Sequence, residues 1–153
     1  MDKDFLLTSA LLLKQVTPVA AEEYNQKEEL LIAKMNSVMI AKPDIESLIG
    51  INNISMMKDN HTNHARFMAS IFRNQNAEVL VETIIWVFKA YRNHGFTINY
   101  WTTQLNTWII IMKEILSPEC YNEVYPYYLW MKINIPIFEK VSDQKPESLD
   151  SLH

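Results

Sequence analysis

Hydrophobic side chains recur at steps of three and four along most of this 153-residue chain. Residues spaced in this way lie on one face of an α-helix, so the pattern predicts about six helices. They are expected at residues 4–16, 18–40, 53–73, 77–93, 98–116 and 118–135, with a short helical turn at 45–49 in the connection after the second.

Prolines and glycines mark where these helices should begin and end. Pro18 and Pro118 suit the first position of a helix, where a missing N–H costs nothing. Gly50 and Gly95 follow apolar segments and can adopt the left-handed conformation that ends a helix. Pro126 lies inside the last predicted helix, so we expect a kink or break just before it.

The composition favours a single all-helical domain. Only two of the 153 residues are glycine, against an average usage of about 7%, which argues against hairpins, P-loops and dinucleotide-binding turns. The chain is long enough to bury one core without disulfides or metals. We therefore predict an all-α, single-domain helical bundle over residues 1–140, followed by a polar, disordered tail at 141–153.

The charge balance and the single cysteine narrow the class of protein further. The formal charge is −4, from 14 basic and 18 acidic residues, and no basic cluster suggests a nucleic-acid partner. Cys120 is the only cysteine, so no intrachain disulfide can form. Asp2 and Asp4 precede the first apolar run, unlike the basic start of a signal peptide, and no run is long enough to span a bilayer. A soluble cytoplasmic protein is expected.

The predicted helix at 53–73 carries two histidines on its apolar side. That side consists of Ile54, Met57, His61, His64, Met68 and Ile71. An inward imidazole needs a hydrogen-bond partner, a ligand or a metal, which makes His61 and His64 the first candidates for a site. Their spacing would allow both to bind one metal ion, but a third ligand is required.

Several acidic residues and one more histidine could supply that third ligand. They are Glu22, Glu23, Glu28, Glu29, Glu78, Glu82 and His94. None of them forms a Glu-x-x-His or His-Glu-x-x-His motif with His61 or His64. Three interpretations therefore stay open for the pair: hydrogen-bonded core histidines, a metal site, and a haem site.

Aromatic residues are the second candidate feature. Trp86, Tyr91 and Trp108 lie on the central predicted helices and could line a pocket for a planar ligand. The segment 125–130 holds four aromatic rings that cannot all face one side of one helix. We expect some of these rings to meet a second copy of the chain in a homodimer, with a ligand pocket lined by them as the alternative.

The run of helices, with a short connector after the second and histidines on an inward face, resembles globin-like folds. In particular it resembles the haem-less globin-like sensor modules of bacterial stress-signalling proteins. The resemblance covers residues 5–140 and implies a regulatory module that dimerises through helices. Because no catalytic set is assembled, we expect a non-enzymatic sensor or protein-interaction module. The alternative is a haem- or metal-binding protein that uses His61 and His64.

Overall fold

The computed structural model describes residues 2–143, in which all regular structure is helical. The helices of this part are α1 (Lys3–Ala10), α2 (Pro18–Gln26), α3 (Glu28–Ile40), α4 (Ile45–Ile49), α5 (Ile54–Arg73), α6 (Ala77–Arg92), α7 (Ile98–Ile115), α8 (Pro118–Ile133) and α9 (Ile135–Ser142). The predicted all-α bundle is confirmed. The number of helices between residues 2 and 143 is nine rather than six.

The difference in number has three sources: the predicted second helix is divided, the chain forms a further helix, α9, beyond the predicted end of the last one, and the short turn is counted as a helix. The helix expected at 18–40 is interrupted at Lys27, whose backbone angles of φ −95° and ψ 3° are not helical. Asn134 separates α8 from α9, directly before the turn that contains Pro136. The short turn expected at 45–49 is a helix of its own, α4.

The predicted break before Pro126 is wrong, because α8 continues through this proline. Pro126 is exposed, so the carbonyl that loses its helical partner can bind water instead. At the C-terminal end, α9 reaches Ser142, two residues into the predicted tail. The rest of that tail, 144–153, lies outside the described residues.

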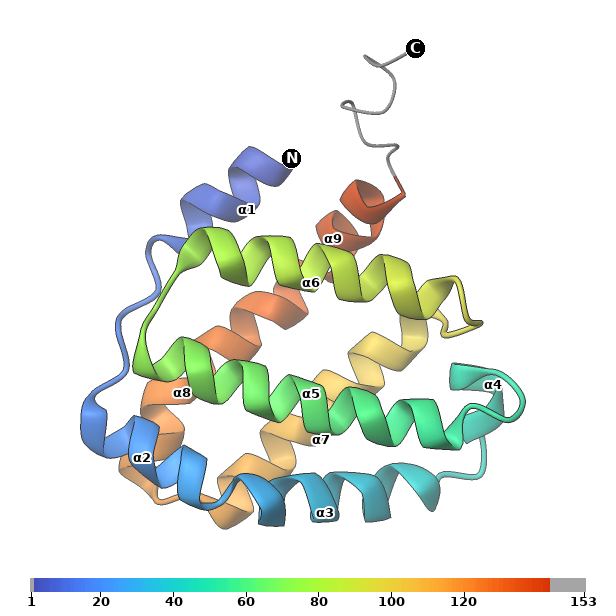
Figure 1. Cartoon of the computed structure of the whole chain (residues 1–153), viewed down its shortest axis with the longest axis horizontal. Helices are drawn as coiled ribbons and strands as arrows, with labels where there is room; N and C mark the ends of the chain where they lie inside the picture. Colours follow the sequence, from blue (N-terminus) through green and yellow to red (C-terminus); the bar gives the residue numbers. More distant parts are fainter. Residues whose placement is uncertain (1, 144–153) are drawn as a thin grey trace.

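The helices form two layers around one core (Figure 1). In this view α5 and α6 cross the front, joined by the turn at 74–76, and α7 and α8 cross behind them. α2 and α3 pack beside α5, whereas α1 and α9 pack beside α6. Because α5 and α6 pack mainly against different helices, they make little direct contact with each other.

The two glycines tie one end of the α5 and α6 pair together. Gly50 (φ 89°) and Gly95 (φ 101°) both have the left-handed backbone predicted for them. A Cβ atom at Gly50 would lie 3.5 Å from the carbonyl oxygen of Gly95. Asn53 Nδ2 donates to the carbonyl oxygens of Ile49 (2.7 Å) and His94 (2.8 Å). The start of α5 is thereby fixed against the end of α6.

The aromatic segment of α8 lies mostly inside the molecule, which corrects the expectation of surplus rings on the surface. Tyr128 is fully buried, Tyr127 is 1% exposed and Trp130 is 8% exposed. They can all be covered because α8 has α2, α7 and α9 as neighbours on different sides. The expectation that this segment has more rings than one copy can bury is therefore wrong, whereas self-association of the chain stays a prediction.

Within residues 2–143, no helix combines the length and the apolar character that crossing a bilayer would require.

Candidate functional site

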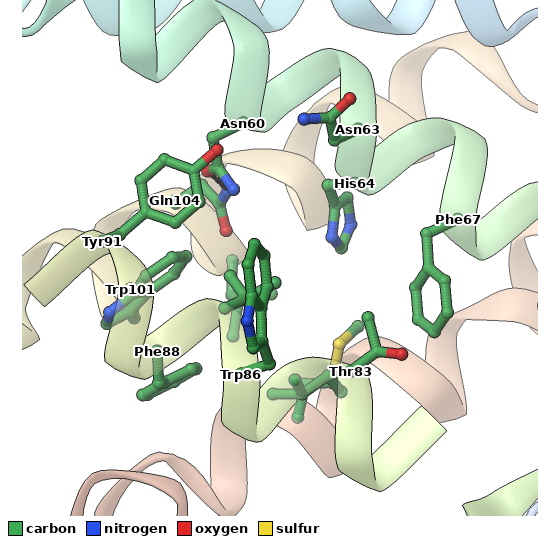
Figure 2. A pocket seen from close by; sticks show the side chains of 14 residues that line it. Asn60, Asn63, His64, Phe67, Thr83, Trp86, Phe88, Tyr91, Trp101 and Gln104 are labelled. Carbon is green, nitrogen blue, oxygen red and sulfur yellow. Dashed lines mark hydrogen bonds between the residues drawn. The ribbon is translucent and has the colours of Figure 1, made fainter. Parts of the chain in front are cut away.

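A cavity of about 270 Å³ lies between α5 and α6, with α7 and α8 behind it (Figure 2). Its lining is Asn60, Asn63, His64 and Phe67 of α5, Thr83, Ile84, Trp86, Val87, Phe88 and Tyr91 of α6, Trp101, Gln104 and Leu105 of α7, and Met131 of α8. As far as the chain is described, this lining contains no Asp, Glu, Lys, Arg or Cys. A cavity of roughly 150 Å³ is enough to hold benzene, so this one has room for a larger apolar molecule.

His64 projects from α5 into this cavity, opposite Thr83 and Trp86 of α6 (Figure 2). Its Nε2 atom lies 2.9 Å from the hydroxyl oxygen of Tyr128, which lies 2.8 Å from the hydroxyl oxygen of Tyr24. Both tyrosines are fully buried. Burial lowers the pKa of His64 to about 3, so its imidazole is neutral at physiological pH.

His61 lies one turn away and is fully buried. Its Nδ1 atom is 2.6 Å from Oδ1 of Asn36, whereas its Nε2 atom has no hydrogen-bond partner within residues 2–143. Burial, and secondarily the nearby His64, lowers the pKa of His61 to about 3. The inward orientation predicted for both histidines is confirmed, but only His64 reaches the cavity.

The two imidazoles pack against the same buried indole, that of Trp108. The ring centroid of Trp108 lies 5.1 Å from that of His64 and 6.0 Å from that of His61. Each histidine already uses one ring nitrogen in a hydrogen bond to Asn36 or Tyr128. No group of three or more His, Cys, Asp or Glu side chains arranged for a metal ion occurs within residues 2–143. Metal binding by His61 and His64 therefore stays a prediction without a third ligand.

Two buried amides form the polar wall of the cavity. Asn60 is 3% exposed and Gln104 is 2% exposed. Oδ1 of Asn60 accepts from the Tyr100 hydroxyl (2.7 Å) and from Nε2 of Gln104 (2.7 Å). The remaining polar atoms of the pair, Asn60 Nδ2 and Gln104 Oε1, make no hydrogen bond among the described residues and are not sealed from the cavity.

Trp86 and Tyr91 stand on the α6 side of the cavity (Figure 2). The Trp86 side chain is 67% exposed, so it forms part of the rim rather than of the core. Tyr91 is half-buried, and burial raises the pKa of its hydroxyl although the amides of Asn60 and Asn63 lie near it.

The sequence-based candidates are divided by the structure into two groups. His64, Trp86 and Tyr91 line the cavity, whereas His61 and Trp108 lie outside its lining. Asn60 and Gln104 were missed. A signal for both was present, because each is a polar residue on the inward face of its helix: Asn60 stands four residues before His64, and Gln104 three residues after Trp101.

The cavity does not fit a haem. Its volume of about 270 Å³ is below the roughly 300–1,000 Å³ typical of pockets for drug-sized ligands, and a haem is larger than most of those. The wall opposite His64 is made by α6, whose lining residues in this structure include no His, Cys or Met that could bind the iron from the other side.

Comparisons of the chain with protein-family models, with curated proteins and with solved structures gave no match. The site must therefore be interpreted from its own geometry.

Proposed function

We propose that this chain is a non-enzymatic sensor or regulatory module whose input is a small, mostly apolar molecule held between α5 and α6. The observation that carries the proposal is the cavity itself, a largely aromatic space with a few buried polar groups on one wall. Concave apolar pockets with a small number of convergent polar groups are the usual form of small-molecule sites.

Binding without catalysis is favoured by the neutral chemistry of the site. Burial lowers the pKa of His64 to about 3, which makes its imidazole a weak base, and its Nε2 atom is already hydrogen-bonded to Tyr128, so it is poorly suited to general-base catalysis at neutral pH. Cys120 lies away from the cavity, and its Sγ donates to the carbonyl oxygen of Ala20 at 3.3 Å. Burial, with the negative charge of Glu23, raises the pKa of the Cys120 thiol to about 12, which makes it a weak nucleophile.

The proposed module passes its signal on as a homodimer in the cytoplasm, by analogy with the haem-less globin-like sensors that the sequence pattern resembles. Support comes from aliphatic side chains left in solvent by the single copy. Leu11, Leu12, Ile110 and Ile133 are each at least 60% exposed. Burying such side chains in a contact would contribute favourable free energy.

A cavity-filling substitution tests the ligand site. Naphthalene is a suitable probe, because it has two fused rings and no polar atom. Ligand-observed NMR should detect its binding to the wild type and not to Thr83→Phe, whose new ring would occupy the cavity. Val79→Phe adds the same ring one turn earlier on α6, at an exposed residue outside the cavity lining, and is the matched control, which should bind naphthalene like the wild type. Equal binding to Thr83→Phe and the wild type, or no binding to the wild type, would refute the proposal.

The alternative function, haem or metal binding through His61 and His64, is favoured only by their closeness on α5. A visible absorption spectrum and elemental analysis of the purified protein would decide it. A Soret band or a stoichiometric metal that disappears in His64→Leu would establish this alternative.

A further inference from the structure

The hydrogen bonds behind His64 determine which of its ring nitrogens carries the proton. If Nε2 donated to Tyr128, then Tyr128 would donate to Tyr24, and the hydroxyl proton of Tyr24 would have no acceptor within residues 2–143. Tyr24 is fully buried, and an unpaired donor there is costly. In the reverse direction Tyr24 donates to Tyr128 and Tyr128 donates to Nε2, so both hydroxyl protons are paired. The neutral imidazole then carries its proton on Nδ1.

The Nδ1 atom of His64, a residue that lines the cavity, is the ring nitrogen that this chain of hydrogen bonds leaves free. It has no hydrogen-bond partner among the described residues. Within residues 2–143, the side-chain polar atoms that are fully buried without a hydrogen-bond partner are His61 Nε2 and Trp108 Nε1. Nδ1 of His64 is not among them, so it is accessible. His64 therefore presents an N–H donor to whatever occupies the cavity.

The amide wall adds one donor and one acceptor. As described above, Nδ2 of Asn60 and Oε1 of Gln104 make no hydrogen bond of good geometry among the described residues, although the Tyr91 hydroxyl lies near the Asn60 amide. If both side-chain amides are flipped, so that oxygen and nitrogen exchange places, the wall still offers one hydrogen-bond donor and one acceptor. The amide wall can therefore bind either a donor or an acceptor atom of a ligand. The preference of the site for an acceptor comes from the N–H group of His64.

The lining also selects against a charged ligand. Among residues 2–143, no charged side chain lines the cavity, and burial keeps His64 neutral by lowering its pKa to about 3. A carboxylate or an ammonium group would lose its hydration without an ionic partner, which is strongly unfavourable.

We propose, building on the function proposed above, that the ligand is a neutral molecule of about two fused rings that carries a hydrogen-bond acceptor and places it at Nδ1 of His64. The ring size follows from the volume, which exceeds the roughly 150 Å³ that accommodates benzene. The aromatic side chains around the cavity, including Phe88 and Trp101, offer faces and edges to a flat molecule.

Three probes of nearly the same shape test this inference. Naphthalene has no polar atom, quinoline has one acceptor, and indole has one donor. The wild type should bind quinoline roughly three- to tenfold more tightly than naphthalene, the gain typical of one hydrogen bond. In His64→Leu the affinity for quinoline should fall to that for naphthalene, whereas His94→Leu, at an exposed histidine outside this cavity, should behave like the wild type.

Tyr128→Phe supplies a second variant in which His64 is retained. Without the Tyr128 hydroxyl, the proton of His64 can move between its two nitrogens. The preference for quinoline over indole should then shrink while the affinity for naphthalene stays unchanged. In the wild type, the nitrogen chemical shifts of labelled histidine should show the proton of His64 on Nδ1.

The outcomes separate this inference from the proposed function. If none of the three probes binds the wild type, the proposed function itself fails. If naphthalene and quinoline bind equally, or if His64→Leu weakens indole more than quinoline, a ligand site exists but its preference for an acceptor is refuted. A proton found on Nε2 of His64 would refute the inference without any ligand.

Discussion

At the scale of single residues, two buried ring nitrogens lack hydrogen-bond partners within residues 2–143, and they belong to two rings in contact. Nδ1 of His61 donates to Asn36, so its Nε2 is an acceptor without a donor, and the indole N–H of Trp108 is a donor without an acceptor. The two rings pack edge to face. A neutral His61 tolerates this burial, whereas a protonated one would place a second unpaired donor, and a charge, in the core.

The two histidines of α5 should make folding sensitive to mild acid. Their pKa values are about 3 in the folded protein and near 6.5 in the unfolded chain. Between these values the unfolded chain binds more protons, so the free energy of unfolding falls as the pH falls below about 6.5. The loss is at most about 2 kcal/mol per histidine by pH 5, and smaller for the partly exposed His64.

Urea unfolding at several pH values between about 5 and 8 measures this loss. His64→Gln should reduce the slope of the unfolding free energy against pH by up to the amount that corresponds to one bound proton, because glutamine does not titrate. Ser70→Gln, which adds the same side chain at an exposed position of α5 without removing a titrating group, is the control and should leave the slope as it is in the wild type. A stability that is unchanged from pH 7 to pH 5 would contradict the depressed pKa values.

The buried amide Asn60 should contribute more to stability than its neighbour Asn63. Asn60→Ala leaves the hydroxyl of Tyr100 and the amide of Gln104 without their acceptor, which should cost about 2–4 kcal/mol. Asn63 is exposed on the same helix, so Asn63→Ala should change stability by about 0.5 kcal/mol or less. Chemical denaturation compares the two, and losses of equal size would show that the Asn60 network is not needed for folding.

At the scale of helices, the end of α2 is joined to the start of α8 by one carboxylate. Glu23 accepts from the backbone N–H of Ser117 (2.7 Å) and from its hydroxyl (2.7 Å), and it pairs with Lys27 (3.1 Å). Burial raises the pKa of Glu23, but the hydrogen bonds from Ser117 and the charge of Lys27 outweigh it, so the pKa is lowered overall. The stabilisation of the fold by the Glu23 carboxylate is complete at pH values above the unfolded pKa of about 4.5 and is lost as the pH falls through the lower pKa of the folded state.

Glu23→Gln should therefore destabilise the fold by about 1–2 kcal/mol, because a neutral amide accepts these hydrogen bonds less strongly than a carboxylate. Glu22→Gln is the matched control one residue earlier. Glu22 is exposed and its ion pair with Arg73 spans 3.7 Å, so its removal should cost about 0.5 kcal/mol or less. Urea unfolding at neutral pH distinguishes the two variants, and a larger loss for Glu22→Gln would refute the assigned role of Glu23.

Sequence periodicity predicted most of the helices because burial of one face follows directly from spacing along the chain. The inward face of α5 was predicted for this reason, whereas the positive φ angles of Gly50 and Gly95 were predicted from the preference for glycine at helix ends. The interruption at Lys27 could not be predicted, since it depends on the partners that this residue meets in three dimensions, such as the carbonyl oxygen of Ile115. A helical pattern does not encode a stop that only tertiary contacts cause.

The candidate site was only partly predictable for the same reason. Spacing placed both His61 and His64 on the inside of the fold. The packing of α5 against α3 brings His61 to Asn36, and the space between α5 and α6 gives His64 a cavity. Neither arrangement can be derived from spacing along the chain. The amides of Asn60 and Gln104 come from helices distant in sequence, and their pairing has no sequence signature.

At the scale of the whole molecule, self-association should depend on aliphatic side chains rather than on the aromatic segment of α8. The rings at 127, 128 and 130 are buried in one copy, whereas Ile110, Ile133 and Leu12 are exposed. Single exposed apolar residues are common, so a dimer requires that some of them share one contact surface. Burying each would contribute about 1.5–3 kcal/mol.

Size-exclusion chromatography with light scattering should give twice the monomer mass at micromolar concentration. At least one of Leu12→Ser, Ile110→Ser and Ile133→Ser should return the protein to a monomer without changing its thermal unfolding, and the variant that does so identifies the contact surface. Tyr125→Ser, at a half-buried position of the aromatic segment, is the matched control and should leave the dimer intact. If only Tyr125→Ser dissociates the dimer, the interface lies on the aromatic segment of α8. If the wild type is monomeric at all concentrations tested, the homodimer is refuted, but the proposed ligand site is not affected.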